Sequence, residues 1–294
     1  MAVSPVPAPT RLRADAEAAA AAVPDLLLAA ERLAASVDPG AHGLRRAGSG
    51  DEFWQYRPAT DSDPAASIDW RRSARSDATF VRERERQSPQ AAAIWVSGAS
   101  GMAWTGDPAR PEKRDRARLI ALALGLILLR GGERVGIGAT EARAGRTQAA
   151  ALARDLLLPG ADGEWPQPGT LRPQRRVVLI GDFLGDIAPL ERLLADAAAM
   201  GAGGALVQVL DPVEESFPFT GAVRFAAPGG VAQHETRDAE GLRRAYLARL
   251  ADRRAALARL AASAGWRVVT HDTAAPPAQV LMALATALSD GRAG

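Results

Sequence analysis

The stretch RVVLIGDFLGD, at positions 176–186, decides the fold because it joins a short apolar run to a turn. The run at 176–180 is bounded by turn residues and shows no polar alternation, which is typical of a strand buried on both faces in a parallel sheet. The following residues, 187–200, have the apolar spacing of a helix, and Asp186 stands where a helix N-cap is expected. A buried strand followed directly by a helix is the repeating unit of an α/β fold.

The same alternation continues toward both ends of the chain. A hairpin is predicted from 222–225 and 231–234, which flank Pro228-Gly229-Gly230. The alternation predicts a Rossmann-like α/β domain over 88–294, with a mainly parallel sheet covered on both faces and ligands at the carboxyl ends of its strands. The remaining buried strands are predicted at 91–96, 134–137, 205–210 and 266–270, and the remaining helices at 113–129, 147–158, 239–264 and 277–289.

The N-terminal part has a different texture. Residues 1–24, rich in proline and alanine, are predicted to form a flexible tail. A helix is predicted at 25–37, because Pro24 and Asp25 suit a first helical turn. The rest of 25–87 mixes aromatic, arginine and aspartate residues without a helical period, which predicts an irregular segment with short strands.

Composition excludes several classes of function. The chain has 294 residues, a net charge of +2, no cysteine and three histidines that lie far apart in sequence. Disulfides, zinc knuckles, iron–sulfur clusters and thiol nucleophiles are therefore excluded, and the charge balance argues against a nucleic-acid partner. The apolar run at 119–129 has eleven residues, whereas a membrane span needs about 17–25. We therefore expect a cytoplasmic protein without a membrane span.

Several motifs together resemble the DUF58 family, whose members carry a von Willebrand factor A-like domain. The resemblance extends over roughly 25–287, and its most specific part is IDWRRSARSD at 68–77. The other matching motifs are FWQYR at 53–57, VRERE at 81–85, GERVGI at 132–137, VVLIGDF at 177–183 and LDPVEESFPF at 210–219.

The resemblance implies a function in protein interaction rather than catalysis. Members of the family are thought to act with MoxR-type AAA+ ATPases in a chaperone-like or assembly role. We therefore expect a non-enzymatic interaction module with a MoxR-type partner, an unknown client protein, no catalytic residues and no cofactor.

The resemblance also directs attention to a metal loop. Some A-type domains hold a metal with an Asp-x-Ser-x-Ser loop, a threonine loop and a further aspartate. Mg²⁺ needs carboxylate and hydroxyl oxygens of this kind, and the aligned positions supply too few of them, so we expect a degenerate site without metal. Alignment on Met102 places Ser97, Ala99 and Gly101 at the loop positions and Asp182 at the further aspartate, with Thr140 or Thr147 as candidates for the threonine.

The part of 25–87 that follows the predicted helix carries the motifs at 53–57, 68–77 and 81–85, and we call it the signature segment. It allows two interpretations. In the first, Asp69 forms a buried ion pair among Arg57, Trp70 and Arg75 that stabilises the irregular chain. In the second, the same residues anchor a partner protein, because tryptophan, tyrosine and arginine dominate interface hot spots. The candidate interaction residues are Trp54, Tyr56, Arg57, Asp69, Trp70 and Arg75.

Two alternatives belong to other functional classes. Ser100, Asp211 and His271 follow the chain order of a hydrolase triad, although Met102 replaces the last glycine of the G-x-S-x-G elbow. The other alternative is a metal-dependent A-type domain. Asp182 would then face the crevice above the sheet, whereas in the structural interpretation it braces its own loop.

Overall fold

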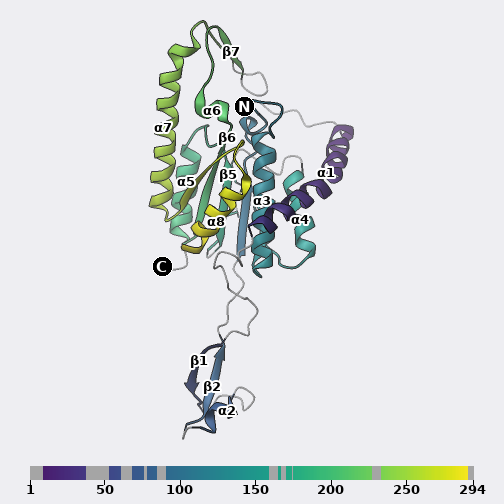
Figure 1. The fold of residues 1–294 in the computed structure, drawn as a ribbon, viewed down its shortest axis with the longest axis vertical. Coiled ribbons are helices and arrows are strands. Elements are labelled where there is room, and N and C mark those ends of the chain that lie inside the picture. The colour runs from purple at the N-terminus through teal and green to yellow at the C-terminus, as the bar shows by residue number, and fades with distance from the viewer. Residues whose placement is uncertain are drawn as a thin grey trace. The chain divides into compact units, whose positions relative to one another are not determined.

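The structure is a computed structural model that describes residues 9–37, 53–60, 68–75, 78–84, 91–158, 165–166, 170–173, 175–226 and 233–290. The chain divides into two compact units (Figure 1). The larger unit comprises Met1–Asp38 with Gln90–Gly294, and the smaller one comprises Pro39–Pro89. The helices and strands predicted after residue 88 agree with the structure to within about two residues where both bounds are described. The N-terminal helix does not agree and is described below.

A five-stranded parallel sheet forms the centre of the larger unit, within the part of the chain that the structure describes. Four of these strands are runs of mainly apolar residues that are buried on both faces, whereas the edge strand at 267–272 is only partly buried. The α/β class with a parallel sheet is thereby confirmed. In spatial order the strands are β4 (Arg134–Ile137), β3 (Ala91–Val96), β5 (Arg176–Gly181), β6 (Gly204–Leu210) and β9 (Arg267–Asp272).

Helices cover both faces of this sheet, and alternate strand residues supply two separate cores. Ile94 and Val96 of β3 belong to the first core, whereas Ala93 and Trp95 belong to the second. The first core is closed by α1 (Pro9–Ser36), α3 (Lys113–Arg130), α4 (Thr147–Leu157) and α8 (Pro277–Asp290) (Figure 1). The second is closed by α5 (Ala188–Ala199) and α7 (Ala239–Ser263).

The first helix begins earlier than predicted. Helix α1 starts at Pro9 and contains Pro24, so it includes residues that we expected in a flexible tail. Alanine has the highest helix propensity of all residue types, and a run of alanines precedes Pro24. The helix therefore extends from Pro24 toward the N-terminus through this run. Its later turns bury Ala30 and Ala34 in the first core, so the helix belongs to the sheet-containing unit and not to the signature segment.

The smaller unit contains the short strands that the sequence predicted. Strands β1 (Phe53–Pro58) and β2 (Phe80–Arg84) pair antiparallel, and the one-turn helix α2 (Trp70–Ser73) lies between them in sequence. A second hairpin, in the larger unit, pairs β7 (Val223–Ala226) with β8 (Gln233–Thr236). The start of its predicted second strand, at 231–232, lies outside the described residues.

Two short helices follow strands at the carboxyl edge and were not predicted. The 3-10 turn η3 (Ser100–Met102) follows β3, and α6 (Pro212–Ser216) follows β6. Helix α6 begins with a capping box, in which Asp211 accepts from the backbone and Glu214 accepts from the N–H of Asp211. None of the described helices combines the length and apolarity that crossing a membrane requires.

Candidate functional site

The candidate site lies where the strand order of the sheet reverses direction. From β3 the chain moves to β4 on one side and then returns to β5 on the other side, so the loops after β3 and β5 diverge above the sheet. Ligands of open α/β sheets bind at such a point, beyond the carboxyl ends of the strands. The β3 loop carries Ser97, Ala99 and Gly101, and the β5 loop carries Asp182.

These two loops approach each other closely. The N–H of Ser97 donates to the carbonyl oxygen of Ile180 at 2.8 Å. A Cβ atom on Gly101 would lie 2.8 Å from Oδ2 of Asp182, so only glycine fits there without a shift. The structure therefore brings the aligned loop and Asp182 together, but with backbone rather than a hydroxyl facing the carboxylate.

A lysine that the sequence analysis did not single out joins this edge of the sheet. Nζ of Lys113, at the start of α3, lies 3.0 Å from Oδ2 of Asp182 and 2.6 Å from Oε1 of Glu214. The Lys113 side chain is 1% exposed. Burial raises the pKa of Glu214, although the charge and hydrogen bond of Lys113 oppose that shift. Two features of the sequence could have pointed to Lys113 and Glu214. Lys113 is the only lysine, and Asp-Pro-Val-Glu at 211–214 is a helix-start motif.

The two aspartates of the β5 loop have different roles. Asp182 serves both expected purposes: its Oδ1 accepts from the N–H of Leu184 at 3.4 Å, while its Oδ2 faces Lys113. Asp186 accepts from the N–H of Ala188 at 3.1 Å, but the N-cap of α5 is Ile187, so Asp186 lies one residue before the position that was predicted for it. Only Asp182 is thus part of the candidate site.

The residues present do not fit a metal of the kind that the A-type resemblance implies. Oγ of Ser97 accepts from the N–H of Ala99 at 3.2 Å, and the hydroxyl of Thr140 accepts from the N–H of Ile137 at 2.9 Å. Thr147 is the first residue of α4. Within the described ranges, no three histidine, aspartate or glutamate residues are grouped so that they could hold a metal ion. A hard cation would thus lack the oxygen ligands that it needs.

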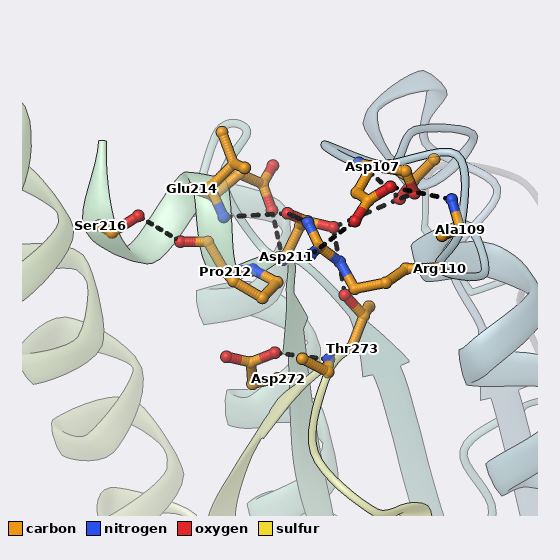
Figure 2. Close-up of polar contacts among 12 residues, drawn as sticks. Asp107, Ala109, Arg110, Asp211, Pro212, Glu214, Ser216, Asp272 and Thr273 are labelled. Carbon is orange, nitrogen blue, oxygen red and sulfur yellow. Dashed lines mark hydrogen bonds and ion pairs between the residues drawn. The ribbon is translucent and has the colours of Figure 1, made fainter. Parts of the chain in front are cut away.

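A further carboxylate, Asp211, organises the loops beside Lys113 (Figure 2). Its side chain is fully buried, with Oδ1 accepting from the N–H of Val213 at 2.9 Å and pairing with Arg110 at 3.2 Å. Oδ2 accepts from the hydroxyls of Thr273 at 3.2 Å and Thr105 at 3.4 Å. Burial alone raises the pKa of Asp211, but the backbone N–H groups and Arg110 outweigh it and hold that pKa below its usual value. Asp211 thus joins three separate loops at one point.

The contacts of Asp211 do not form a hydrolase triad. Its partners are Arg110, two threonines and backbone N–H groups, and His271 is not among the contacts described above. Burial, assisted by Arg116 and opposed by Asp272, lowers the pKa of His271 to about 4. Its buried Nε2 has no hydrogen-bond partner in the described structure. The relay from Ser100 through His271 to Asp211 is therefore not formed.

Two of the signature residues are exposed rather than buried, and the side chains of Trp54, Tyr56 and Arg57 lie outside the described residues. Trp70 is 62% exposed, and Arg75 is also exposed. Oδ1 of Asp69 accepts from the N–H of Arg72 at 3.0 Å and caps α2. An aspartate before a one-turn helix satisfies orphan N–H groups more readily than it forms a buried ion pair. Trp54, Tyr56 and Arg57 lie on β1.

Replacement of Asp69 by alanine is expected to lower the free energy of unfolding by about 1 kcal/mol, the usual contribution of an N-cap. Asp69→Asn should be close to wild type, because asparagine caps equally well. Amide hydrogen exchange of residues 70–75, together with thermal melts, measures the effect. A loss of about 3 kcal/mol in both variants would instead indicate a buried ion pair.

The fold and this edge define an A-type α/β protein whose acidic groups are held by its own cations. The chain belongs to the DUF58 family: the sequence model described as "Protein of unknown function DUF58" matches residues 55–256. The comparison with curated proteins gave no match.

Three solved structures are similar to the chain at low sequence identity. The conserved hypothetical protein BatB from Bacteroides thetaiotaomicron is 13% identical, with a TM-score of 0.41 over 70% of this chain and 100% of that chain. An aerotolerance-related membrane protein from Bacteroides fragilis is 12% identical, with a TM-score of 0.39 over 68% and 99%. An uncharacterized membrane spanning protein from Vibrio fischeri is 15% identical, with a TM-score of 0.18 over 68% and 98%.

Proposed function

We propose that this DUF58 chain is a non-enzymatic protein-interaction module that works with a MoxR-type AAA+ ATPase in a chaperone-like or assembly role. The observation that carries the proposal is the internal pairing of charges at the carboxyl edge of the sheet. Lys113 pairs with Asp182 and Glu214, and Arg110 pairs with Asp211. Because a AAA+ partner consumes ATP, the proposal also places the chain in the cytoplasm.

Internal pairing favours a binding role because catalysis needs groups that are free to react. A general base must accept a proton from substrate, and a nucleophile needs a base beside it. At this edge the carboxylates are engaged by cations and backbone N–H groups, and burial holds His271 neutral near pH 7. The same bonds fix the loops after β3, β5 and β6 in one arrangement, which suits a preformed binding surface.

The smaller unit offers a candidate anchor for the partner. Trp70 exposes 62% of its surface on α2, and the neighbouring Arg71 and Arg75 are exposed as well. Arg72 holds its guanidinium 5.2 Å from the centroid of the Phe80 ring, which ties α2 to β2. An exposed tryptophan beside arginines, on a helix fixed to a strand, has the composition of an interface hot spot.

A pull-down tests both parts of the proposal. Tagged protein, incubated with native-cell extract and ATP, is expected to retain a MoxR-type ATPase, identified by mass spectrometry. Trp70→Ala should weaken retention at least about tenfold, the loss typical of a hot-spot residue. Its melting temperature should stay close to wild type, because an exposed side chain contributes little to folding.

Met200→Ala is the matched control, because Met200 is 42% exposed and lies at the end of α5 in the larger unit. It should bind like the wild type. Failure of the wild type to retain any ATPase, with and without ATP, would contradict the proposed partnership. Equal retention by Trp70→Ala and wild type would remove Trp70 from the interface while leaving the partnership intact.

A further inference from the structure

The only lysine of the chain is buried, although lysine is normally the most solvent-exposed kind of residue. The charge of Lys113 lies between two carboxylates, at 3.0 Å from Asp182 and 2.6 Å from Glu214. Its Nζ is also 5.9 Å from the centroid of the Trp104 ring. A desolvated ammonium is tolerated only when paired and hydrogen-bonded in this way.

A residue with left-handed backbone lies close to each carboxylate in sequence. Phe183, directly after Asp182, has φ of 51°, and Phe217, which ends the helix that carries Glu214, has φ of 45°. Left-handed backbone is uncommon for a bulky residue and persists where surrounding structure fixes it. The loop after Asp182 and the end of the helix that carries Glu214 are therefore each held in a sparsely populated conformation.

With Lys113 in place, the surroundings of Asp182 accommodate its ammonium but leave no room for a hydrated divalent cation beside it. Gly101 approaches Oδ2 so closely that even a Cβ would be 2.8 Å away, which leaves no space for a hydroxyl ligand on that side. Mg²⁺ requires six oxygens at about 2.0–2.1 Å, including several waters that it gives up reluctantly. An ammonium instead donates three hydrogen bonds at ordinary distances, and Asp182 and Glu214 accept two of them.

We propose that the Lys113 ammonium is the permanent cation of this site. It occupies the place beside Asp182 that a divalent metal would take in a metal-dependent A-type domain. The wild-type protein therefore binds no divalent cation here, and loss of the ammonium leaves a carboxylate pair that recruits one. This inference concerns the chemistry of the site and is independent of which partner the protein binds.

The first test uses the wild-type protein. Calorimetric titration with CaCl₂ and with MgCl₂ is expected to show no binding at millimolar concentration. Reductive methylation with ¹³C-formaldehyde should leave Lys113 unmodified in native protein and modify it in urea; the α-amino group reacts in both samples, and Lys113 is the only side-chain amine. Binding of either cation at this concentration, or rapid methylation of Lys113 in native protein, would overturn the proposal.

The second test removes the ammonium and keeps the apolar stem. Lys113→Met is expected to bind Ca²⁺, which accepts irregular oxygen sets, with a dissociation constant on the order of 10⁻⁴–10⁻³ M. The double variant Lys113→Met with Asp182→Asn should lose that binding. A folded Lys113→Met protein that binds no Ca²⁺ would overturn the claim that the carboxylates form a cation site. If this variant does not fold, the two wild-type measurements decide.

Arg116→Met is the matched control on the same helix. The guanidinium of Arg116 donates to the carbonyl oxygens of Thr273 and Ala275, so its removal exposes no carboxylate pair. It should gain no Ca²⁺ affinity, and a gain equal to that of Lys113→Met would show a nonspecific effect. The combined changes Ser97→Asp, Ala99→Ser and Gly101→Ser should not create a site while Lys113 is present, since Asp182 remains engaged and Gly101 lacks space.

Discussion

Replacement of Asp211 by alanine is expected to lower the free energy of unfolding by about 4 kcal/mol. The substitution removes the cap of α6, which contributes about 1 kcal/mol, and deprives Arg110 of a fully buried partner. Breaking a buried ion pair costs about 3–5 kcal/mol, and the 24% exposure of Arg110 favours the lower end. Urea unfolding, monitored by circular dichroism, measures the change.

Asp107→Ala is the matched control, because Asp107 pairs with the same Arg110 but is 44% exposed. An exposed ion pair contributes about 0–1 kcal/mol, so this variant should melt near the wild type. Asp211→Asn should fall between the two, since its amide oxygen still caps α6 while the charge is lost. Equal stability of Asp211→Ala and Asp107→Ala would contradict the role of Asp211 as the point that joins the loops.

The stability of the wild-type protein is expected to fall by about 3 kcal/mol between pH 6.5 and pH 4 because of His271. Burial lowers the pKa of His271 in the folded state to about 4, whereas the unfolded chain keeps a value near 6.5. Below pH 6.5 the unfolded state therefore binds a proton that the folded state does not, which favours unfolding as the pH falls. Asp211, with its pKa lowered, loses its contribution only at more acidic pH.

His271→Phe removes the titrating group and should flatten the decline in this window. His234→Gln, which changes an exposed histidine on β8, should retain the wild-type profile. Urea midpoints measured from pH 7 to pH 4.5 give both profiles. A wild-type protein of constant stability over this range, or a His271→Phe variant with an unchanged slope, would contradict the assignment.

Local sequence determined the sheet and most of its helices. The strand at 176–181 was recognised from local sequence, because an apolar run that is too short for an ordinary helix, rich in valine and isoleucine and bounded by turn residues favours a buried strand. Its partner strands follow from the same pattern. Helix α1 was the exception, because the rule that proline begins a helix competed with strong alanine propensity upstream of Pro24.

The exposure of Trp70 was not predicted from residue type alone. Asp69 stands among arginines and tryptophan in the sequence, which suggested a buried ion pair. In the structure it caps a single helical turn, and Trp70 is exposed. Burial depends on how many residues from distant segments cover a side chain, and a local motif carries little information about that number.

The sequence by itself determined the class of fold, the edge of the sheet at which polar loops gather, and the lack of metal ligands in the loop at 97–101. Tertiary structure alone decided that Lys113 meets Asp182 and Glu214, which lie 69 and 101 residues away along the chain. In a parallel sheet the carboxyl ends of all strands lie at the same edge, so loops that are far apart along the chain can lie side by side. Which loops become neighbours depends on the spatial order of the strands and on the packing of the helices. A solitary lysine on a helix is expected to be solvent-exposed, and only that packing places it between two carboxylates.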